Sequence, residues 1–225
     1  MNKMAFSPLF KRLPPGLEVQ VAKVEDCLRD LSEPEQALVS NAIASRRAEF
    51  SSTRKLAHQM LERLGFPKAP LLINPDRSPA WPKEVLGSLS HSRAHCAVAL
   101  CDKKSEILGV GIDIEDQRPI KTKMFAEILT PQELERLQRF TPEERHSEFV
   151  LRAFTVKEAL YKAMHPIGNE GLGFHAMETD FRADSTRPRV LPMADLQRRL
   201  PQGCKIQAHH HRHGQTYLSV VIVQP

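Results

Sequence analysis

The chain has 225 residues, of which 41% are hydrophobic and 26% are charged, and its formal net charge is +5. Its apolar runs are too short to cross a bilayer, and its length allows one large domain or two lobes of roughly 100 residues each. The basic balance favours an anionic partner, but an aromatic content of 6% weakens the case for nucleic acid. We expect no secretory signal peptide, and we expect the four cysteines to be reduced thiols of a cytoplasmic protein.

The first half of the chain is predicted to be helical and then extended. Residues 32–65 are predicted to form two helices, because Ser32 and Glu35 can make a capping box at their start. A proline-rich loop is predicted over 66–87, followed by one or two strands over 88–101.

The second half begins with a strand over 107–115 and becomes helical further on. Thr130 and Thr141 are each followed by proline and, three positions on, by glutamate, which predicts two helix starts. The second of these helices should end near Met164. Residues 204–223 are predicted to form a hairpin with a glycine in its turn.

Each half therefore carries helices followed by antiparallel strands. We predict an α+β fold of two similar lobes, a pseudo-dimer with antiparallel sheets and a cleft between the lobes. The N-terminal lobe would comprise residues 1–108 and the C-terminal lobe residues 109–225.

Two short segments about forty residues apart carry the side chains of a predicted site. GVGIDIED sets Asp113 and Glu115 on one face of a strand, and FTVKEALYKA sets Glu158 and Lys162 on one face of a helix. Three carboxylates and a lysine suit a hard divalent cation that holds a phosphate. Taken alone, the strand pair is better explained as solvated charges, and the helix pair as a stabilising contact of roughly 0.2–0.5 kcal/mol.

In combination these motifs resemble the phosphopantetheinyl transferases of the enterobactin-synthetase type. GIDIE is followed at the family's spacing by F-x-x-KEALYKA, and three further stretches agree in order: RRAEFSSTR at 46–54, PDRSPAWP at 75–82 and SLSHS at 88–92. The resemblance runs from about residue 32 to residue 174. Phe154 departs from the tryptophan that many relatives have, which we expect to affect packing rather than chemistry.

The resemblance implies transfer of the 4'-phosphopantetheine arm of coenzyme A to a serine hydroxyl on an acyl or peptidyl carrier protein, with release of 3',5'-ADP. Carried over by motif, Asp113, Glu115 and Glu158 would hold Mg²⁺ against the pyrophosphate of CoA. Glu158, or a water beside it, would take the serine proton. Lys162 would steady the pyrophosphate charge, and Lys157 is close enough in sequence to help.

CoA also carries a 3'-phosphate, so the resemblance implies cationic groups in the N-terminal lobe, which would bind the nucleotide. The candidates are basic or polar side chains of that lobe: Arg46, Arg47, Arg54, Arg77, Ser90 and His91. Without the other motifs, the arginines are better explained as solvated surface groups, and the serine as structural.

Other interpretations remain open at this level. A non-catalytic basic module that binds RNA or DNA is the main alternative, and a metal-dependent phosphohydrolase without a carrier protein is a third. We reject a metal site in the tract HHHRH at 209–213, since it lies at a hairpin turn and has no counterpart in the family. The preferred interpretation predicts a monomer that contacts neither nucleic acid nor a membrane.

The acceptor surface for the carrier protein is predicted near segment 118–130. Arg118, Lys121 and Lys123 supply positive charge there, next to the acidic motif, and carrier proteins of this kind are acidic. An ordinary solvated loop explains the same residues equally well.

Overall fold

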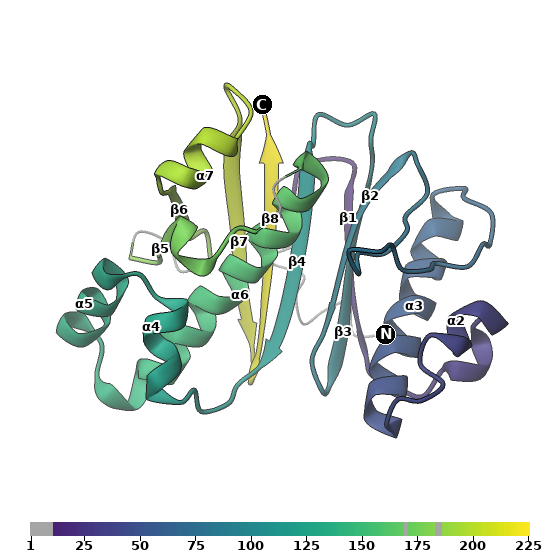
Figure 1. Cartoon of the computed structure of the whole chain (residues 1–225), viewed down its shortest axis with the longest axis horizontal. Helices are drawn as coiled ribbons and strands as arrows, with labels where there is room; N and C mark the ends of the chain where they lie inside the picture. Colours follow the sequence, from purple (N-terminus) through teal and green to yellow (C-terminus); the bar gives the residue numbers. More distant parts are fainter. Residues whose placement is uncertain (1–10, 169–170, 183–185) are drawn as a thin grey trace. The chain divides into compact units, whose positions relative to one another are not determined.

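In a computed structural model of the protein, which describes residues 11–168, 171–182 and 186–225, the chain divides into two units between Ser105 and Glu106 (Figure 1). Each unit holds a three-stranded antiparallel sheet with one long helix packed on it, so the fold is α+β as predicted. None of the helices formed by the described residues combines the length and apolar character that spanning a bilayer requires.

The sheet of the first unit has the spatial order β1 (Leu17–Lys23), β3 (His95–Asp102) and β2 (Val85–His91). Helix α3 (Ala44–Arg63) packs across this sheet and follows the short helix α2 (Glu33–Ala37). The two helices lie where the sequence predicts them, and β2 and β3 lie near the predicted strands, although β2 begins at Val85, within the stretch predicted as loop. Strand β1 was not predicted, because the sequence analysis assigned no helix or strand before residue 32.

Local and tertiary contacts both hold the first unit together. The predicted capping box is present, because Ser32 donates to Glu35 Oε2 from its backbone N at 3.2 Å and from its hydroxyl at 2.7 Å. Leu56 and Met60 lie on the buried face of α3 and pack with Val98 and other apolar residues of the sheet. Burial of this face, rather than helix propensity, is what stabilises so long a helix.

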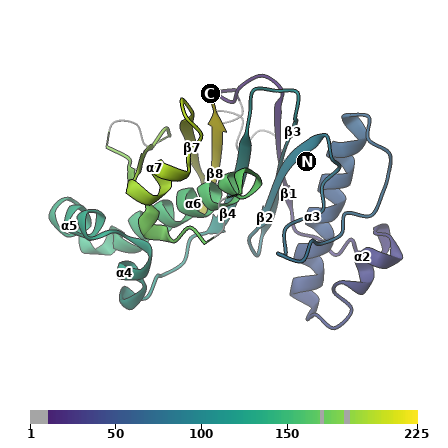
Figure 2. The same cartoon turned by 45° about the horizontal axis from the view of Figure 1, so that its top comes forward.

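The sheet of the second unit has the order β4 (Gly109–Asp116), β8 (Thr216–Gln224) and β7 (Lys205–His213). Strand β8 is central and almost wholly buried, as its run of valines and isoleucine requires. Helix α6 (His146–Met164) packs on β4 and β8, and Figure 2 shows it along these strands. The hairpin turn between β7 and β8 contains Gly214, as predicted.

The second unit also contains helix α5, which follows the predicted start at Thr130. Elements that the sequence analysis did not predict are helix α4, the two-stranded sheet that pairs β5 with β6, and helix α7 after it. Their bounds are Phe125–Ile128 for α4, Pro131–Phe140 for α5, Met177–Asp180 for β5, Arg189–Pro192 for β6 and Ala194–Arg199 for α7. Single 3-10 turns lie at Leu28–Asp30, Thr122–Met124, Glu143–Arg145, His165–Ile167 and Phe174–Ala176.

Two glycines on β4 let α6 lie directly on the strand. A Cβ at Gly109 would overlap the carbonyl oxygen of Ala163, and a Cβ at Gly111 would overlap that of Ala159. These neighbours are helix backbone, so they cannot rotate away as a flexible side chain would. The helix can approach this closely only where the strand has no side chain.

Replacing Gly111 with alanine is therefore expected to lower the free energy of unfolding by about 1–3 kcal/mol, because α6 must move away from β4. Urea unfolding of purified protein measures the change. Gly173→Ala is the matched control, since Gly173 has an ordinary φ of −86° and a Cβ there meets nothing within 4 Å. Equal stability of the two variants would contradict the packing argument.

Candidate active site

The two predicted motifs meet where β4 packs against α6. Asp113 and Glu115 follow the two glycines on the strand face that contacts the helix. Glu158 and Lys162 lie on α6. Lys162 Nζ donates to Asp113 Oδ1 at 2.7 Å and to the carbonyl oxygen of Ile112 at 3.1 Å, which joins the helix to the strand.

Burial, with repulsion from Asp113, makes Glu115 and Glu158 weaker acids than usual. Burial raises the pKa of Glu115 to about 7, and the charge of Asp113 adds to the rise. Arg118, whose Nη2 lies 3.6 Å from Glu115 Oε2, opposes this pKa rise together with Lys162. Burial also raises the pKa of Glu158; Lys162 opposes that rise and Asp113 adds to it. The cluster therefore holds more negative charge than its two cationic neighbours neutralise.

A divalent cation fits the chemistry of this cluster. Carboxylate oxygens are the ligands that Mg²⁺ prefers, and a cation would offset the burial and the repulsion from Asp113 that raise the two pKa values. Among the described residues, however, no three His, Cys, Asp or Glu side chains converge into a metal-binding arrangement. The ammonium group of Lys162 contacts Asp113 instead. The ligand set Asp113, Glu115 and Glu158 thus stays a prediction.

Lys157 has a partner that the sequence analysis did not foresee. Its side chain is fully buried, and Nζ lies 2.5 Å from Glu133 Oε2 and 2.8 Å from the carbonyl oxygen of Ile128. Burial lowers the pKa of Lys157, and the Glu133 carboxylate opposes the fall. Lys157 therefore anchors α6 to α5, and its predicted role beside the pyrophosphate stays a prediction.

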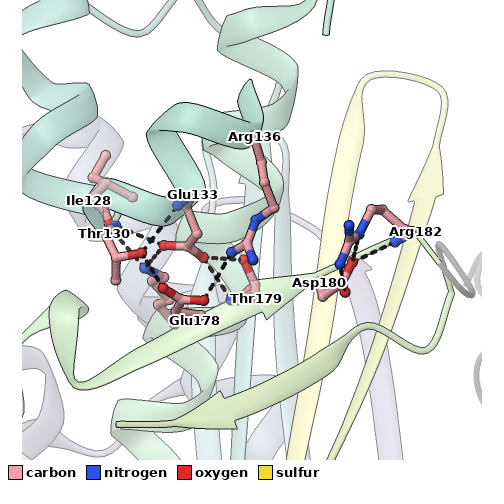
Figure 3. A network of polar contacts seen from close by, with 9 residues as sticks. Ile128, Thr130, Glu133, Arg136, Glu178, Thr179, Asp180 and Arg182 are labelled. Carbon is pink, nitrogen blue, oxygen red and sulfur yellow. Dashed lines mark hydrogen bonds and ion pairs between the residues drawn. The ribbon is translucent and has the colours of Figure 1, made fainter. Parts of the chain in front are cut away.

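Glu133 belongs to a buried polar network that joins α5 to β5. Its Oε1 accepts hydrogen bonds from the backbone N and the hydroxyl of Thr179, both at 2.7 Å, and its Oε2 accepts from the backbone N of Thr130 at 2.9 Å. Next to it, Glu178 accepts from the Thr130 hydroxyl at 2.8 Å and pairs with Arg136 at 3.2 Å (Figure 3). Glu133 thus caps α5, neutralises the buried Lys157 and binds β5 through Thr179.

The signal for Glu133 in the sequence was its position in the capping box, which the structure confirms. Nothing local indicates its further bonds, since Lys157 is 24 residues away in sequence and Thr179 is 46 residues away.

A small pocket of about 170 Å³ opens beside Glu158. Lys157 and Tyr161 line it from the same helix, while Leu172, Phe174 and Met177 line it from the segment that leads into β5. The pocket therefore combines mostly apolar walls with one carboxylate from the predicted catalytic set.

In the first unit the structure brings two predicted residues into contact. A guanidinium nitrogen of Arg46 on α3 contacts Nε2 of His91 on β2, and it lies 3.5 Å from Glu49 Oε2. Nδ1 of His91 lies 3.4 Å from the same carboxylate oxygen. Because a guanidinium only donates, Nε2 must accept and the His91 proton is on Nδ1, facing Glu49. Arg46 is half exposed and His91 is partly exposed, so both are open to a ligand.

Two further residues predicted to bind the nucleotide, Arg54 and Arg77, differ in their burial. Arg54 is buried, donates from Nε to the carbonyl oxygen of Leu71 at 3.0 Å and stacks on Phe50. Burial lowers the pKa of Arg54 to about 10. Arg77 is exposed at φ 70° in a loop, a left-handed conformation that is rare for a residue other than glycine. Arg54 therefore has a structural role, whether or not it also binds the nucleotide of CoA.

The remaining two candidates, Arg47 and Ser90, differ in exposure. Arg47 is partly exposed on α3, whereas Ser90 is buried in β2 opposite Ala97. Their predicted roles stay predictions.

Comparisons with known proteins match most of both units. Residues 34–101 match the family model of the 4'-phosphopantetheinyl transferase N-terminal domain, and residues 109–219 match that of the 4'-phosphopantetheinyl transferase superfamily. The 4'-phosphopantetheinyl transferase Npt of Nocardia iowensis is 30% identical over 174 residues, which cover 76% of each chain. The chain belongs to the 4'-phosphopantetheinyl transferase superfamily.

Two further members show how far the similarity extends. The 4'-phosphopantetheinyl transferase PptT of Mycobacterium tuberculosis is 34% identical over 68% of this chain and 66% of its own length. Enterobactin synthase component D of Escherichia coli (strain K12) is 33% identical over 58% of this chain and 60% of its own length. The chain thus spans less than two thirds of the length of each of these two superfamily members. Both acidic motifs lie inside the superfamily match, and Arg46 and His91 lie inside the N-terminal-domain match.

Proposed function

We propose that this protein transfers the 4'-phosphopantetheine arm of coenzyme A to a serine hydroxyl of an acyl or peptidyl carrier protein and releases 3',5'-ADP. The carboxylate cluster of β4 and α6 carries the proposal, because it lies within the superfamily match and has the donor set that a phosphate-bound cation requires. The names of the relatives support the same reaction class.

Asp113, Glu115 and Glu158 would hold Mg²⁺. Bound there, Mg²⁺ would neutralise negative charge on the pyrophosphate and on the departing 3',5'-ADP. Lys162 extends from the same helix as Glu158 to this cluster, so its ammonium is placed to steady a phosphate oxygen there.

Glu158 is the residue that we assign to the proton transfer. The serine oxygen forms a new bond to the phosphorus that carries the pantetheine arm, the phosphoanhydride bond to 3',5'-ADP breaks, and the serine proton passes to the Glu158 carboxylate. Burial raises the pKa of Glu158, which makes this carboxylate a stronger base than an exposed glutamate.

The pocket beside Glu158 suits the pantetheine arm. That arm is a narrow chain of methylene and amide groups, and apolar walls formed by Leu172, Phe174 and Met177 would bury it. Fixing the arm there would hold its phosphate end near the carboxylates, so that the incoming serine meets it in one orientation.

In the first unit, Arg46 and His91 are proposed to bind the 3'-phosphate. Arg46→Ala and His91→Ala are then expected to weaken the binding of CoA by about ten- to a hundredfold, and that of dephospho-CoA much less, because only CoA carries this phosphate. Calorimetric titration with both ligands measures the difference. Arg63→Ala, an exposed arginine on the same helix, should change neither affinity, and equal losses for CoA and dephospho-CoA in the first two variants would contradict the assignment.

Lys121 and Lys123 are proposed to attract the carrier protein. Both are exposed around the 3-10 turn that precedes α4, whereas Arg118 is already near Glu115. Reversing both lysines to glutamate is expected to raise the KM for carrier protein several-fold and to leave the KM for CoA unchanged. Carrier kinetics at low and high salt measure this effect. Unchanged carrier kinetics would place the acceptor surface elsewhere.

The reaction itself is tested by incubating the protein with CoA, Mg²⁺ and a panel of apo carrier proteins, and then weighing the carriers. A mass increase of one phosphopantetheine group, absent without Mg²⁺, is the expected result. Release of 3',5'-ADP without any carrier modification would favour the metal-dependent phosphohydrolase. Neither product, together with salt-sensitive binding of RNA or DNA, would favour the nucleic-acid module.

A further inference from the structure

A buried glutamate of the first unit holds the base of the loop that carries Arg77. Glu35 is 1% exposed, and its Oε1 accepts a hydrogen bond from the backbone N of Leu71 at 3.1 Å. The carbonyl oxygen of Leu71 accepts from Nε of the buried Arg54 at 3.0 Å. Side chains of α2 and α3 thus bind both backbone polar groups of one loop residue, which fixes where the loop begins.

His58 on α3 keeps the Glu35 carboxylate in place. Its Nε2 lies 2.7 Å from Glu35 Oε1, and both side chains are buried. Burial raises the pKa of Glu35, but hydrogen bonds from Ser32 and His58 outweigh it, so that this pKa is lowered overall. The carboxylate is therefore ionised near neutral pH and only accepts, and Nε2 of His58 carries the proton. A charged acceptor binds the backbone N of Leu71 more strongly than a neutral one would.

Beyond Leu71 the loop closes on itself. Ile73 and Pro79 form an antiparallel bridge, which makes a narrow hairpin of the residues between them. At its tip the backbone N of Arg77 donates to the carbonyl oxygen of Asn74 at 2.9 Å, and Arg77 has a φ of 70°. A left-handed conformation at a residue other than glycine persists only where its surroundings hold it. Because the hairpin is closed, its anchor at Leu71 determines where the tip lies.

Arg77 is the exposed basic residue of this hairpin, and it is one of the residues predicted to bind the nucleotide of CoA. A phosphate contact from an arginine on a loosely held loop is weakened, because the loop loses conformational freedom on binding. Glu35 and Arg54 reduce this cost, since they hold the base of the loop before any ligand arrives.

We propose that Glu35 is a positioning residue for CoA: through Leu71 it holds the hairpin so that Arg77 meets a phosphate of the nucleotide. This role rests on the proposed function, because only CoA gives Arg77 such a ligand here. Glu35 is too deeply buried to touch CoA itself. Its loss should therefore raise the KM for CoA and leave kcat unchanged, since the carboxylates of the second unit are untouched.

A double-mutant cycle tests this role, with the affinity for CoA measured by calorimetric titration of the full chain. Arg77→Ala is expected to weaken CoA about tenfold, and Glu35→Ala about three- to tenfold. When Arg77 is already alanine, Glu35→Ala should weaken CoA by less than about twofold more, because the side chain that it positions is gone. Losses that multiply in the double variant, or an unchanged affinity in either single variant, would overturn the proposal.

Ser32→Ala is the matched control. The Ser32 hydroxyl donates to the other carboxylate oxygen of Glu35 at 2.7 Å, so its loss weakens the start of α2 and keeps the bond to Leu71. It should change the affinity for CoA by less than about twofold. If Glu35→Ala does not fold, the cycle is measured with Glu35→Gln, whose neutral acceptor binds Leu71 more weakly. A loss of about twofold or more, which vanishes without Arg77, is then expected.

Hydrogen exchange without CoA separates this role from the proposed function. Glu35→Ala should speed the exchange of the amide protons of Leu71 and Arg77, whereas Ser32→Ala should not. If CoA binds the unsubstituted protein but exchange in the hairpin is the same in both variants, the positioning role alone is overturned. If the unsubstituted protein binds no CoA, the proposed function fails, and the positioning role fails with it.

Discussion

Glu158→Gln is expected to reduce carrier-protein modification by about a thousandfold or more while the protein stays folded. The substitution removes both a predicted metal ligand and the proposed proton acceptor, but keeps the size and shape of the side chain. Because burial raises the pKa of Glu158, its charge is costly in the folded state, and the midpoint of thermal unfolding should stay equal or rise slightly. Mass spectrometry of the carrier and thermal unfolding of the variant measure the two effects.

The matched control is Glu127→Gln on α4, which changes an exposed glutamate in the same unit. It should leave both transfer and unfolding unchanged. Transfer by the Glu158 variant within tenfold of the unsubstituted protein would remove this residue from the metal site and from proton transfer. Loss of transfer with a lowered midpoint of unfolding would show a structural role instead.

The second large effect is expected in stability. Glu133→Ala should lower the free energy of unfolding by about 3–5 kcal/mol, because it leaves the ammonium group of Lys157 buried without its counter-ion. It also removes the acceptor for the backbone N and hydroxyl of Thr179. Urea unfolding measures the loss.

Two further variants separate charge from packing. The double substitution Glu133→Leu with Lys157→Met should recover much of the stability, since an apolar pair of similar volume needs no counter-ion. Glu135→Ala, at an exposed position on the same helix, should cost less than about 0.5 kcal/mol. A loss below about 1 kcal/mol in Glu133→Ala would show that the buried pair matters little to the fold.

Local signals in the sequence were sufficient for much of the fold. The helix start at Thr130, the strand that carries Asp113 and the terminal hairpin are encoded within a few residues each, by capping side chains, alternation and a turn glycine. The start predicted at Thr141 is wrong, because a 3-10 turn follows it and helix α6 begins only at His146.

The candidate site could be predicted from the sequence for the same reason. Strand alternation and the helical repeat place Asp113 and Lys162 on defined faces, and the contact between them needs only that these faces meet. What could not be predicted depends on partners distant in sequence. Lys157 precedes Glu158 directly, yet the two differ in role because Lys157 meets Glu133 on another helix. The role of Arg54 could not be predicted for the same reason, because its buried position depends on the loop at Leu71.

The glycine contact between β4 and α6 also links ligand binding to folding. Gly111 and Ala159 are far apart in sequence, so the carboxylates gather only when strand and helix are docked, and the unfolded chain cannot offer the same site. Whatever binds there selects the folded form of the second unit and stabilises it by about 2.7 kcal/mol when its free concentration is a hundred times its Kd. The proposed Mg²⁺ and CoA would thus shift the folding equilibrium of this unit toward its folded form.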